Sequence, residues 1–80
     1  MDGWLEEARS KLAAKVGEEP AAYDLTQSDV DELLELARLA AHVSGERINA
    51  PLLCYLVGLA HGRHGGDLSD LVDAAVGTSA

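Results

Sequence analysis

The sequence has one cysteine, no long apolar run and few basic residues, and each shortage excludes a class of protein. Cys54 has no partner in the chain, so no internal disulfide can form; a lone cysteine among apolar neighbours is most simply a small buried side chain in a reducing compartment. The longest apolar run, residues 51–57, is too short to span a membrane, and residues 1–20 contain no apolar segment of the secretory kind. We therefore expect a soluble, cytoplasmic protein.

The scarcity of basic residues limits the choice of partner. Six lysines and arginines stand against fourteen aspartates and glutamates, which gives a formal charge of −8. Such a charge repels phosphate backbones and anionic membranes, so neither nucleic acid nor a membrane is an expected partner. It suits a basic protein partner, or it serves solubility alone.

Catalytic motifs are missing as well. The sequence contains no glycine-rich phosphate loop, no nucleophile elbow and no Ser–His–Asp ordering. Cys54 lies among apolar residues, which raise the pKa of a thiol instead of activating it. We therefore predict that the protein is not an enzyme and uses no cofactor.

The hydrophobic periodicity that is present is helical, and no segment alternates like a strand. Eighty residues suffice for one small domain, so we assign residues 1–80 to a single helical domain. The expected fold is all-α, a small four-helix bundle with a central apolar third helix. Its helices are expected at about residues 3–16, 28–43, 51–63 and 68–76.

The second predicted helix, residues 28–43, has a cap at Thr26 or Ser28, with Asp29 or Asp31 three residues on, as in a capping box. One narrow polar stripe runs along this helix, and apolar side chains cover the rest, so we expect it to contact two neighbours. The stripe consists of Asp31, Glu35, Arg38 and His42. At this spacing the stripe is typical of a solvated helix face with weak ion pairs.

The third predicted helix is apolar on nearly every side. Pro51 suits a first helical turn, with Asn49 or Ala50 at the cap. A helix without a continuous polar face must be covered by protein, so we expect an interior helix wrapped by the other three, or one wall of a subunit interface. Gly58 and Gly62 leave space one turn apart on a face of small residues. That face favours close packing of the second or fourth helix, or alternatively a site for a partner's helix or a flat ligand.

Three histidines and the cysteine raise a second hypothesis. His61 and His64 are three residues apart, Cys54 lies two turns before His61, and His42 could join them in space. Nitrogen and sulfur ligands of this kind hold zinc, but the sequence has no Cys-x-x-Cys pair, so we assign no metal ligands. A small-molecule or metal-binding domain that uses the His42/Cys54/His61 region remains the alternative function.

Acyl and peptidyl carrier proteins share this length and acidity. They carry phosphopantetheine on the serine of an Asp-Ser-Leu motif at the start of their second helix. The serine here at the corresponding place is Ser28, in Gln-Ser-Asp, and Ser69 lies in Leu-Ser-Asp. Neither serine matches the motif, so a carrier function is not predicted.

Helix-packing residues over most of positions 4–62 form a recognisable pattern. The pattern comprises Trp4-Leu5, residues 33–38, Ala41-His42, Arg47, residues 50–52 and residues 55–60. It resembles a small uncharacterised helical domain family of actinobacteria, some members of which are fused to, or encoded near, the molybdenum-cofactor guanylyltransferase and molybdoenzymes. The resemblance implies an accessory role in molybdenum-cofactor delivery or in a molybdoenzyme complex, and it supplies no catalytic residues.

Taken together, the residues predict a non-catalytic module that binds another protein; a homodimer that buries part of the second or third helix would suit the same apolar surface. The acidic face of the second helix would meet a basic patch, and the loop that follows it would add specificity. The residues expected at this surface are Asp31, Glu35, Arg38, His42, Arg47, Asn49 and Pro51.

Overall fold

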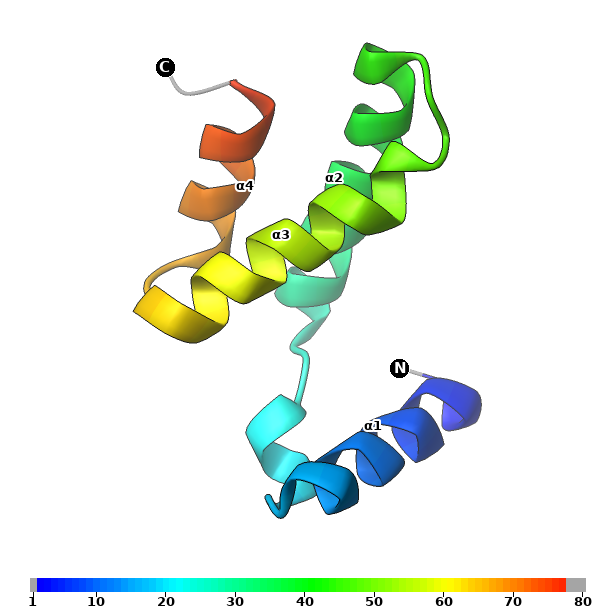
Figure 1. Ribbon diagram of the computed structural model, residues 1–80, viewed down its shortest axis with the longest axis vertical. Coiled ribbons are helices and arrows are strands. Elements are labelled where there is room, and N and C mark those ends of the chain that lie inside the picture. Colours follow the sequence, from blue (N-terminus) through cyan, green and yellow to red (C-terminus); the bar gives the residue numbers. More distant parts are fainter. Residues whose placement is uncertain (1, 78–80) are drawn as a thin grey trace.

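The computed structural model describes residues 2–77, and every regular element in that range is helical. The elements are α1 (Gly3–Val16), the 3₁₀ helix η1 (Pro20–Tyr23), α2 (Gln27–Ser44), α3 (Asn49–His64) and α4 (Leu68–Val76) (Figure 1). The all-α class and the four helices expected from the sequence are confirmed. α2 and α3 extend one or two residues beyond the expected bounds at each end.

Local side-chain chemistry fixes the ends of the first two α-helices. Asp2 caps α1, since its Oδ1 accepts a 2.8 Å hydrogen bond from the N–H of Leu5. Gly17, with a φ of 76°, ends the helix in the left-handed conformation that glycine adopts without strain. Thr26 and Asp29 form a capping box at the start of α2, because each side chain accepts a 3.0 Å bond from the other's N–H.

α3 begins earlier than the sequence suggests. Ile48 occupies the cap position with φ and ψ of −65° and −19°, and it offers no side-chain acceptor. The expectation that Asn49 or Ala50 caps this helix is therefore wrong. The Asn49 amide instead donates a 3.0 Å hydrogen bond back to Ser44 Oγ, which ties the start of α3 to the end of α2.

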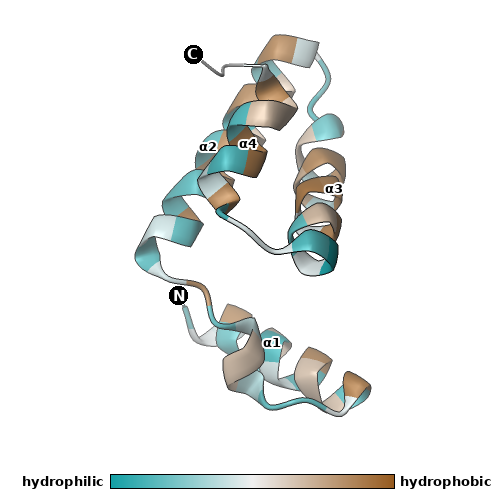
Figure 2. Ribbon diagram, turned by 90° about the vertical axis from the view of Figure 1, so that its left-hand side faces the viewer, coloured by the Kyte–Doolittle hydropathy of each residue, from teal (hydrophilic) through white to brown (hydrophobic). Residues whose placement is uncertain are grey.

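Three helices, α2, α3 and α4, pack against one another and form the core. Leu36 of α2, Val57 of α3 and Val72 of α4 meet at its centre, and all three are buried. Figures 1 and 2 show these helices side by side from two directions. The core is small, because only five hydrophobic residues of the described chain are buried.

α1 lies apart from this core and packs against η1 alone among the elements of residues 2–77 (Figures 1 and 2). Ala13 is buried in that contact. An ion pair joins Arg9 to Asp24, and the Tyr23 hydroxyl donates a 2.6 Å hydrogen bond to Glu18. These contacts make α1 and η1 one unit, which the residues Asp24 to Thr26 connect to α2.

The expectation that α3 is an interior helix wrapped by its three companions is wrong, since among the elements of residues 2–77 it contacts only α2 and α4. The reason lies in the connector: Asp24 and Thr26 both have extended backbones, with ψ of 140° and 166°, and lead α1 away from α3. The expected close packing of the second or fourth helix against Gly58 and Gly62 is also absent. No atom of another element lies within 4 Å of where a Cβ would stand on either residue.

Candidate protein-binding groove

Apolar surface is the most prominent feature of the folded chain. Within residues 2–77, twelve large apolar side chains are exposed, against five buried hydrophobic residues. They are Trp4, Leu5, Leu12, Val16, Leu25, Leu34, Val43, Ile48, Leu52, Tyr55, Leu56 and Leu59. Isolated exposed leucines are ordinary on proteins, but contiguous apolar patches mark binding surfaces.

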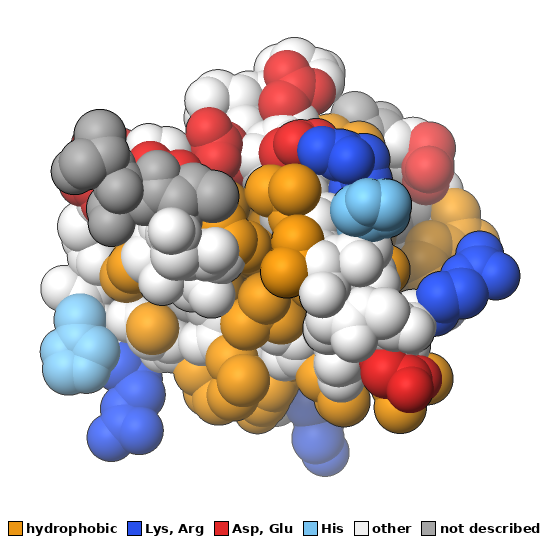
Figure 3. Space-filling model, turned by 90° about the horizontal axis from the view of Figure 1, so that it is seen from above, with side chains coloured by type: hydrophobic (Ala, Val, Ile, Leu, Met, Phe, Trp, Pro, Cys, Tyr) orange, Lys and Arg blue, Asp and Glu red, His pale blue; other side chains and the backbone are white. Residues whose placement is uncertain are grey.

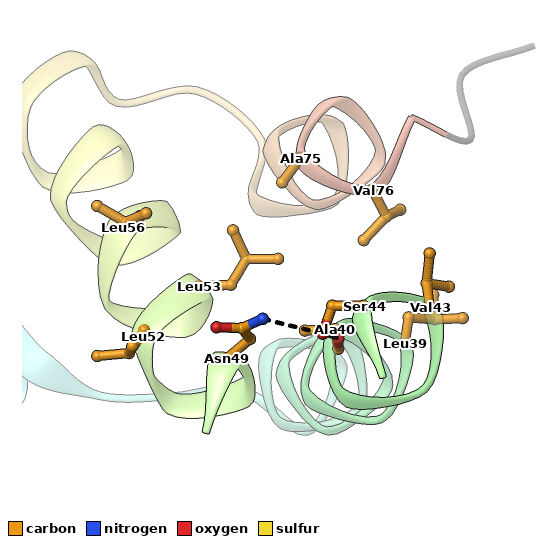
Figure 4. A pocket seen from close by; sticks show the side chains of 10 residues that line it. All are labelled: Leu39, Ala40, Val43, Ser44, Asn49, Leu52, Leu53, Leu56, Ala75 and Val76. Carbon is orange, nitrogen blue, oxygen red and sulfur yellow. Dashed lines mark hydrogen bonds between the residues drawn. The ribbon is translucent and has the colours of Figure 1, made fainter. Parts of the chain in front are cut away.

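Part of this surface lines a groove of about 470 Å³ between the second half of α2, the first half of α3 and the end of α4. We call it the apolar groove. Its lining residues are Leu39, Ala40, Val43, Ser44, Asn49, Leu52, Leu53, Leu56, Ala75 and Val76 (Figure 4). Hydrophobic side chains also form a band through the middle of the face seen in Figure 3. The lining suits an apolar occupant.

The two polar residues of the apolar groove are engaged with the chain itself. Ser44 Oγ donates a 2.6 Å hydrogen bond to the carbonyl oxygen of Ala40 and accepts one of 3.0 Å from the Asn49 amide (Figure 4). The N–H of Glu46 also donates to Ser44 Oγ, at 3.2 Å. These bonds shape the turn between α2 and α3 and leave the rest of the groove apolar.

The outward face of α3 continues the apolar surface. Leu52, Tyr55, Leu56 and Leu59 follow one another at the spacing that aligns side chains on one helix face, and they are 58%, 67%, 58% and 41% exposed. We call these four residues the α3 stripe. Leu52 and Leu56 belong to both the stripe and the apolar groove, so the two surfaces are continuous.

A second groove, of about 360 Å³, lies where η1 and the connector approach the ends of α2, α3 and α4. Cys54, Gly58 and His61 line this lower groove. Cys54 Sγ lies 3.9 Å from the carbonyl oxygen of Leu33, and partial burial raises the pKa of its thiol. His61 Nε2 lies 3.1 Å from the carbonyl oxygen of Gly66.

The alternative site predicted from the histidines is not assembled. Cys54 lies opposite Leu33, whereas His42 is nine residues further along α2, about 14 Å at 1.5 Å per residue. His42 therefore does not join Cys54 and His61 in the lower groove. Within residues 2–77 no group of three or more histidine, cysteine or acidic side chains is arranged to hold a metal ion.

The predicted stripe on α2 is present and exposed: Asp31, Glu35, Arg38 and His42 all face solvent. The Arg38 guanidinium donates two hydrogen bonds to Glu35, of 2.9 and 2.6 Å. These bonds lower the pKa of Glu35 and raise that of Arg38. Asp31 Oδ1 accepts a 2.9 Å bond from the Gln27 amide. We call these four residues the α2 polar stripe.

The loop residues predicted beside that stripe have different roles. Arg47 is exposed in the turn between α2 and α3, and Pro51 is exposed in the first turn of α3. Asn49 is half-buried, and it alone among the seven predicted surface residues lines the apolar groove. The sequence did not predict the groove itself: it placed a possible partner's helix on the small face of Gly58 and Gly62, whereas the groove lies beside Leu52 and Leu56.

These observations define an all-α domain with a small core and an open apolar groove. None of its helices within residues 2–77 is long and apolar enough to cross a membrane. A family described as a domain of unknown function (DUF6457) matches residues 1–80, so the chain belongs to that family. No curated protein and no solved structure matches the chain.

Proposed function

We propose that the protein is a non-catalytic module that binds other proteins, and that its apolar groove accepts an amphipathic helix. The observation that carries the proposal is the continuity of the groove with the α3 stripe, which leaves Leu52, Tyr55, Leu56 and Leu59 exposed together. A hydrophobic groove between helices is a recurrent receptor for the apolar face of a helix. Burying such a patch is favourable by about 25 cal/mol for each Å² of apolar surface removed from water.

The α2 polar stripe serves in this proposal as an electrostatic surface beside the groove. Its acidic side chains, in a chain of formal charge −8, would attract a basic patch and repel acidic partners. Arg47 and Pro51 are exposed at the adjoining turn and would add local contacts, while Asn49 holds that turn in shape.

The titratable groups of the two surfaces have ordinary charge states near neutral pH. The hydrogen bonds from Arg38 lower the pKa of Glu35, so this carboxylate is an anionic group of the α2 polar stripe. Burial raises the pKa of Cys54, which keeps its thiol protonated and weakly nucleophilic.

The family pattern in the sequence suggests the setting of the module. We propose that its partners belong to molybdenum-cofactor synthesis or to a molybdoenzyme complex in an actinobacterial cytoplasm. This part of the proposal rests on the resemblance of the helix-packing residues between positions 4 and 62.

The test is affinity capture from a native cell extract with two matched variants. Leu56→Glu places a charge in the groove, whereas Leu34→Glu places the same charge on α2 at a leucine that is 65% exposed and lines neither the apolar groove nor the lower groove. We expect the wild type and Leu34→Glu to capture the same proteins, and Leu56→Glu to lose them. Capture that is indifferent to Leu56→Glu would contradict the role of the groove. Capture without molybdoenzymes or cofactor-synthesis proteins would contradict the proposal that the partners belong to molybdenum-cofactor synthesis or to a molybdoenzyme complex.

The lower groove supports a second candidate function, the binding of a small molecule beside Cys54 and His61. Their position in one cavity is the observation that favours it. A small-molecule ligand would raise the thermal midpoint of the isolated chain, and the rise would disappear in a Cys54→Ala, His61→Ala double variant. A library of metabolites that leaves the midpoint unchanged would count against this candidate.

A further inference from the structure

We infer that the helix in the apolar groove is α1 of a second copy of this chain, so that two copies exchange their first helices. The inference rests on the proposed function, because it names a second copy of the chain as an occupant of the groove, which the helix of another protein would have to displace. It accounts for two sets of exposed apolar side chains in one short chain: the α3 stripe beside the groove, and the exposed apolar side chains of α1, which among the elements of residues 2–77 contacts η1 alone.

The free face of α1 has the chemistry that the groove requires. Leu5, Leu12 and Val16 share one side of the helix, with Trp4 at its edge, and all four are exposed. We call these four residues the α1 stripe. The adjoining side of α1 is already used, because Ala13 packs against η1, and Arg9, which lies next to Leu5 and Val16 around the helix, pairs with Asp24. The parts of the α1 stripe that stay exposed beside this contact are available to a second surface.

Charge favours this occupant. α1 carries three basic and two acidic side chains, whereas residues 27–77 carry three basic and eight acidic ones. Lys11 and Lys15 lie beside the α1 stripe on the side away from Ala13. α3 contains no acidic residue at all, so a second copy can approach its stripe without direct repulsion between carboxylates.

The α1 of the same chain cannot lie along the groove. The ion pair between Arg9 and Asp24 holds the middle of α1 beside the connector, and the connector joins α2 at its first residue, Gln27. The groove begins at Leu39, twelve residues further along α2, or about 18 Å at 1.5 Å per residue. From Arg9 either half of α1 extends only about 10 Å at 1.5 Å per residue, so the α1 stripe needs a groove on another molecule.

A reciprocal exchange gives a closed assembly of sufficient size. Each copy would donate one α1 and offer one groove, which produces two equivalent contacts about a twofold axis. Burial of the exposed parts of the α1 stripe and of the groove, twice over, removes on the order of 1,500 Å² of surface, the size of a standard specific interface. The exchange also supplies apolar burial to a chain whose core cluster contains three buried residues, Leu36, Val57 and Val72.

Trp4 reports directly on this docking, because it is the only tryptophan and is 78% exposed in the single chain. The experiment measures the molar mass by light scattering and the Trp4 emission over a dilution series of the full chain. We expect a mass near twice 8.4 kDa at high concentration, with Trp4 emission shifted to the blue, and a shift to the red as dilution releases monomer. Monomer at every concentration would overturn the inference, whether its emission is red, with α1 free, or blue, with α1 folded onto its own chain.

Variants then identify which surfaces meet. Leu12→Glu in α1 and Leu56→Glu in the groove should each weaken dimerisation by about thirtyfold or more, whereas Leu34→Glu should not. Leu12→Glu lies on an element that contacts none of α2, α3 or α4, so loss of dimer in this variant cannot arise from unfolding of the groove. A dimer that resists Leu12→Glu would overturn the exchange, because two grooves would then meet without α1.

Mixing the two defective variants gives the final distinction. A pair of Leu12→Glu and Leu56→Glu chains keeps one intact α1 and one intact groove, so we expect this mixture to form more dimer than either variant alone. No recovery in the mixture would also overturn the exchange. A strictly monomeric wild type that still captures partners in a Leu56-dependent manner would refute the exchange and leave the proposed function standing.

Discussion

Thr26 and Asp29 show how single side chains decide where an element begins. Their two reciprocal hydrogen bonds of 3.0 Å satisfy N–H groups that the first turn of α2 cannot satisfy within the helix. We predict that Thr26→Ala lowers the free energy of unfolding by about 1 kcal/mol, measured by urea denaturation. Ser28→Ala, at an exposed neighbour, is the control and should change it by less than about 0.5 kcal/mol. Equal losses in both variants would contradict the capping box.

Cys54 supplies a prediction about pH. Partial burial raises the pKa of its thiol, because desolvation disfavours the thiolate in the folded chain. The thiol should therefore react with a disulfide reagent at a higher pH in the folded protein than in denaturant. We expect its rate–pH profile to be displaced toward alkaline pH when the chain is folded.

The same shift has a consequence for stability. Because the pKa of Cys54 is higher in the folded chain than in the unfolded one, its protonated thiol contributes to the free energy of unfolding. This contribution is fully present below about pH 8.5, the ordinary pKa of a thiol, and is lost as the pH rises through the folded pKa. Denaturation of the wild type and of Cys54→Ala between pH 7 and pH 10 measures this loss, which only the wild type should show from this group. Parallel pH profiles for the two chains would contradict it.

For α3, the sequence predicted the helix but not which of its apolar faces the chain itself would cover. Its helical period, its position and its apolar character were all readable from residues 51–63. Periodicity, however, reports only that a face is covered, and not by which molecule. The face of Val57 is covered by α2 and α4, whereas the face of Tyr55 and Leu56 has the same composition and is exposed. The groove was missed for this reason.

Replacing a glycine of α3 and a glycine of the turn after it should change the free energy of unfolding in opposite directions. No neighbouring atom lies within 4 Å of a Cβ placed on Gly58, and this residue stands inside the helix, so Gly58→Ala should raise the free energy of unfolding by about 1 kcal/mol. Gly65 has φ and ψ of 70° and −153°, a conformation that side chains other than glycine's rarely adopt. Gly65→Ala should therefore lower it by about 1–3 kcal/mol.

Urea denaturation of Gly58→Ala and Gly65→Ala measures both of these changes in the free energy of unfolding. A loss of stability in Gly58→Ala would mean that another backbone does approach this face, as the sequence first suggested. A neutral Gly65→Ala would mean that the turn between α3 and α4 relaxes at little cost.

For the molecule as a whole, the position of α1 is the feature that the sequence could not give. The helix expected at about residues 3–16 is present, and we expected it to pack around the third helix in the chain's own core. The direction of α1 depends on the extended backbone at Asp24 and Thr26, for which neither residue carries a strong local signal. The helices were therefore predictable one by one, but their arrangement was not.

The formal charge of −8 makes a final prediction for the whole chain. Eight of the acidic side chains lie in residues 27–77, where they repel one another, and salt shortens the range of that repulsion from about 30 Å at 0.01 M to about 8 Å at 0.15 M. The urea midpoint should therefore rise over this range of sodium chloride. Removing two of the charges, by Glu32→Gln together with Asp73→Asn, should raise the midpoint at low salt and flatten its dependence on salt. A midpoint that falls with salt would show that attraction between opposite charges, as in the Glu35–Arg38 pair, outweighs the repulsion.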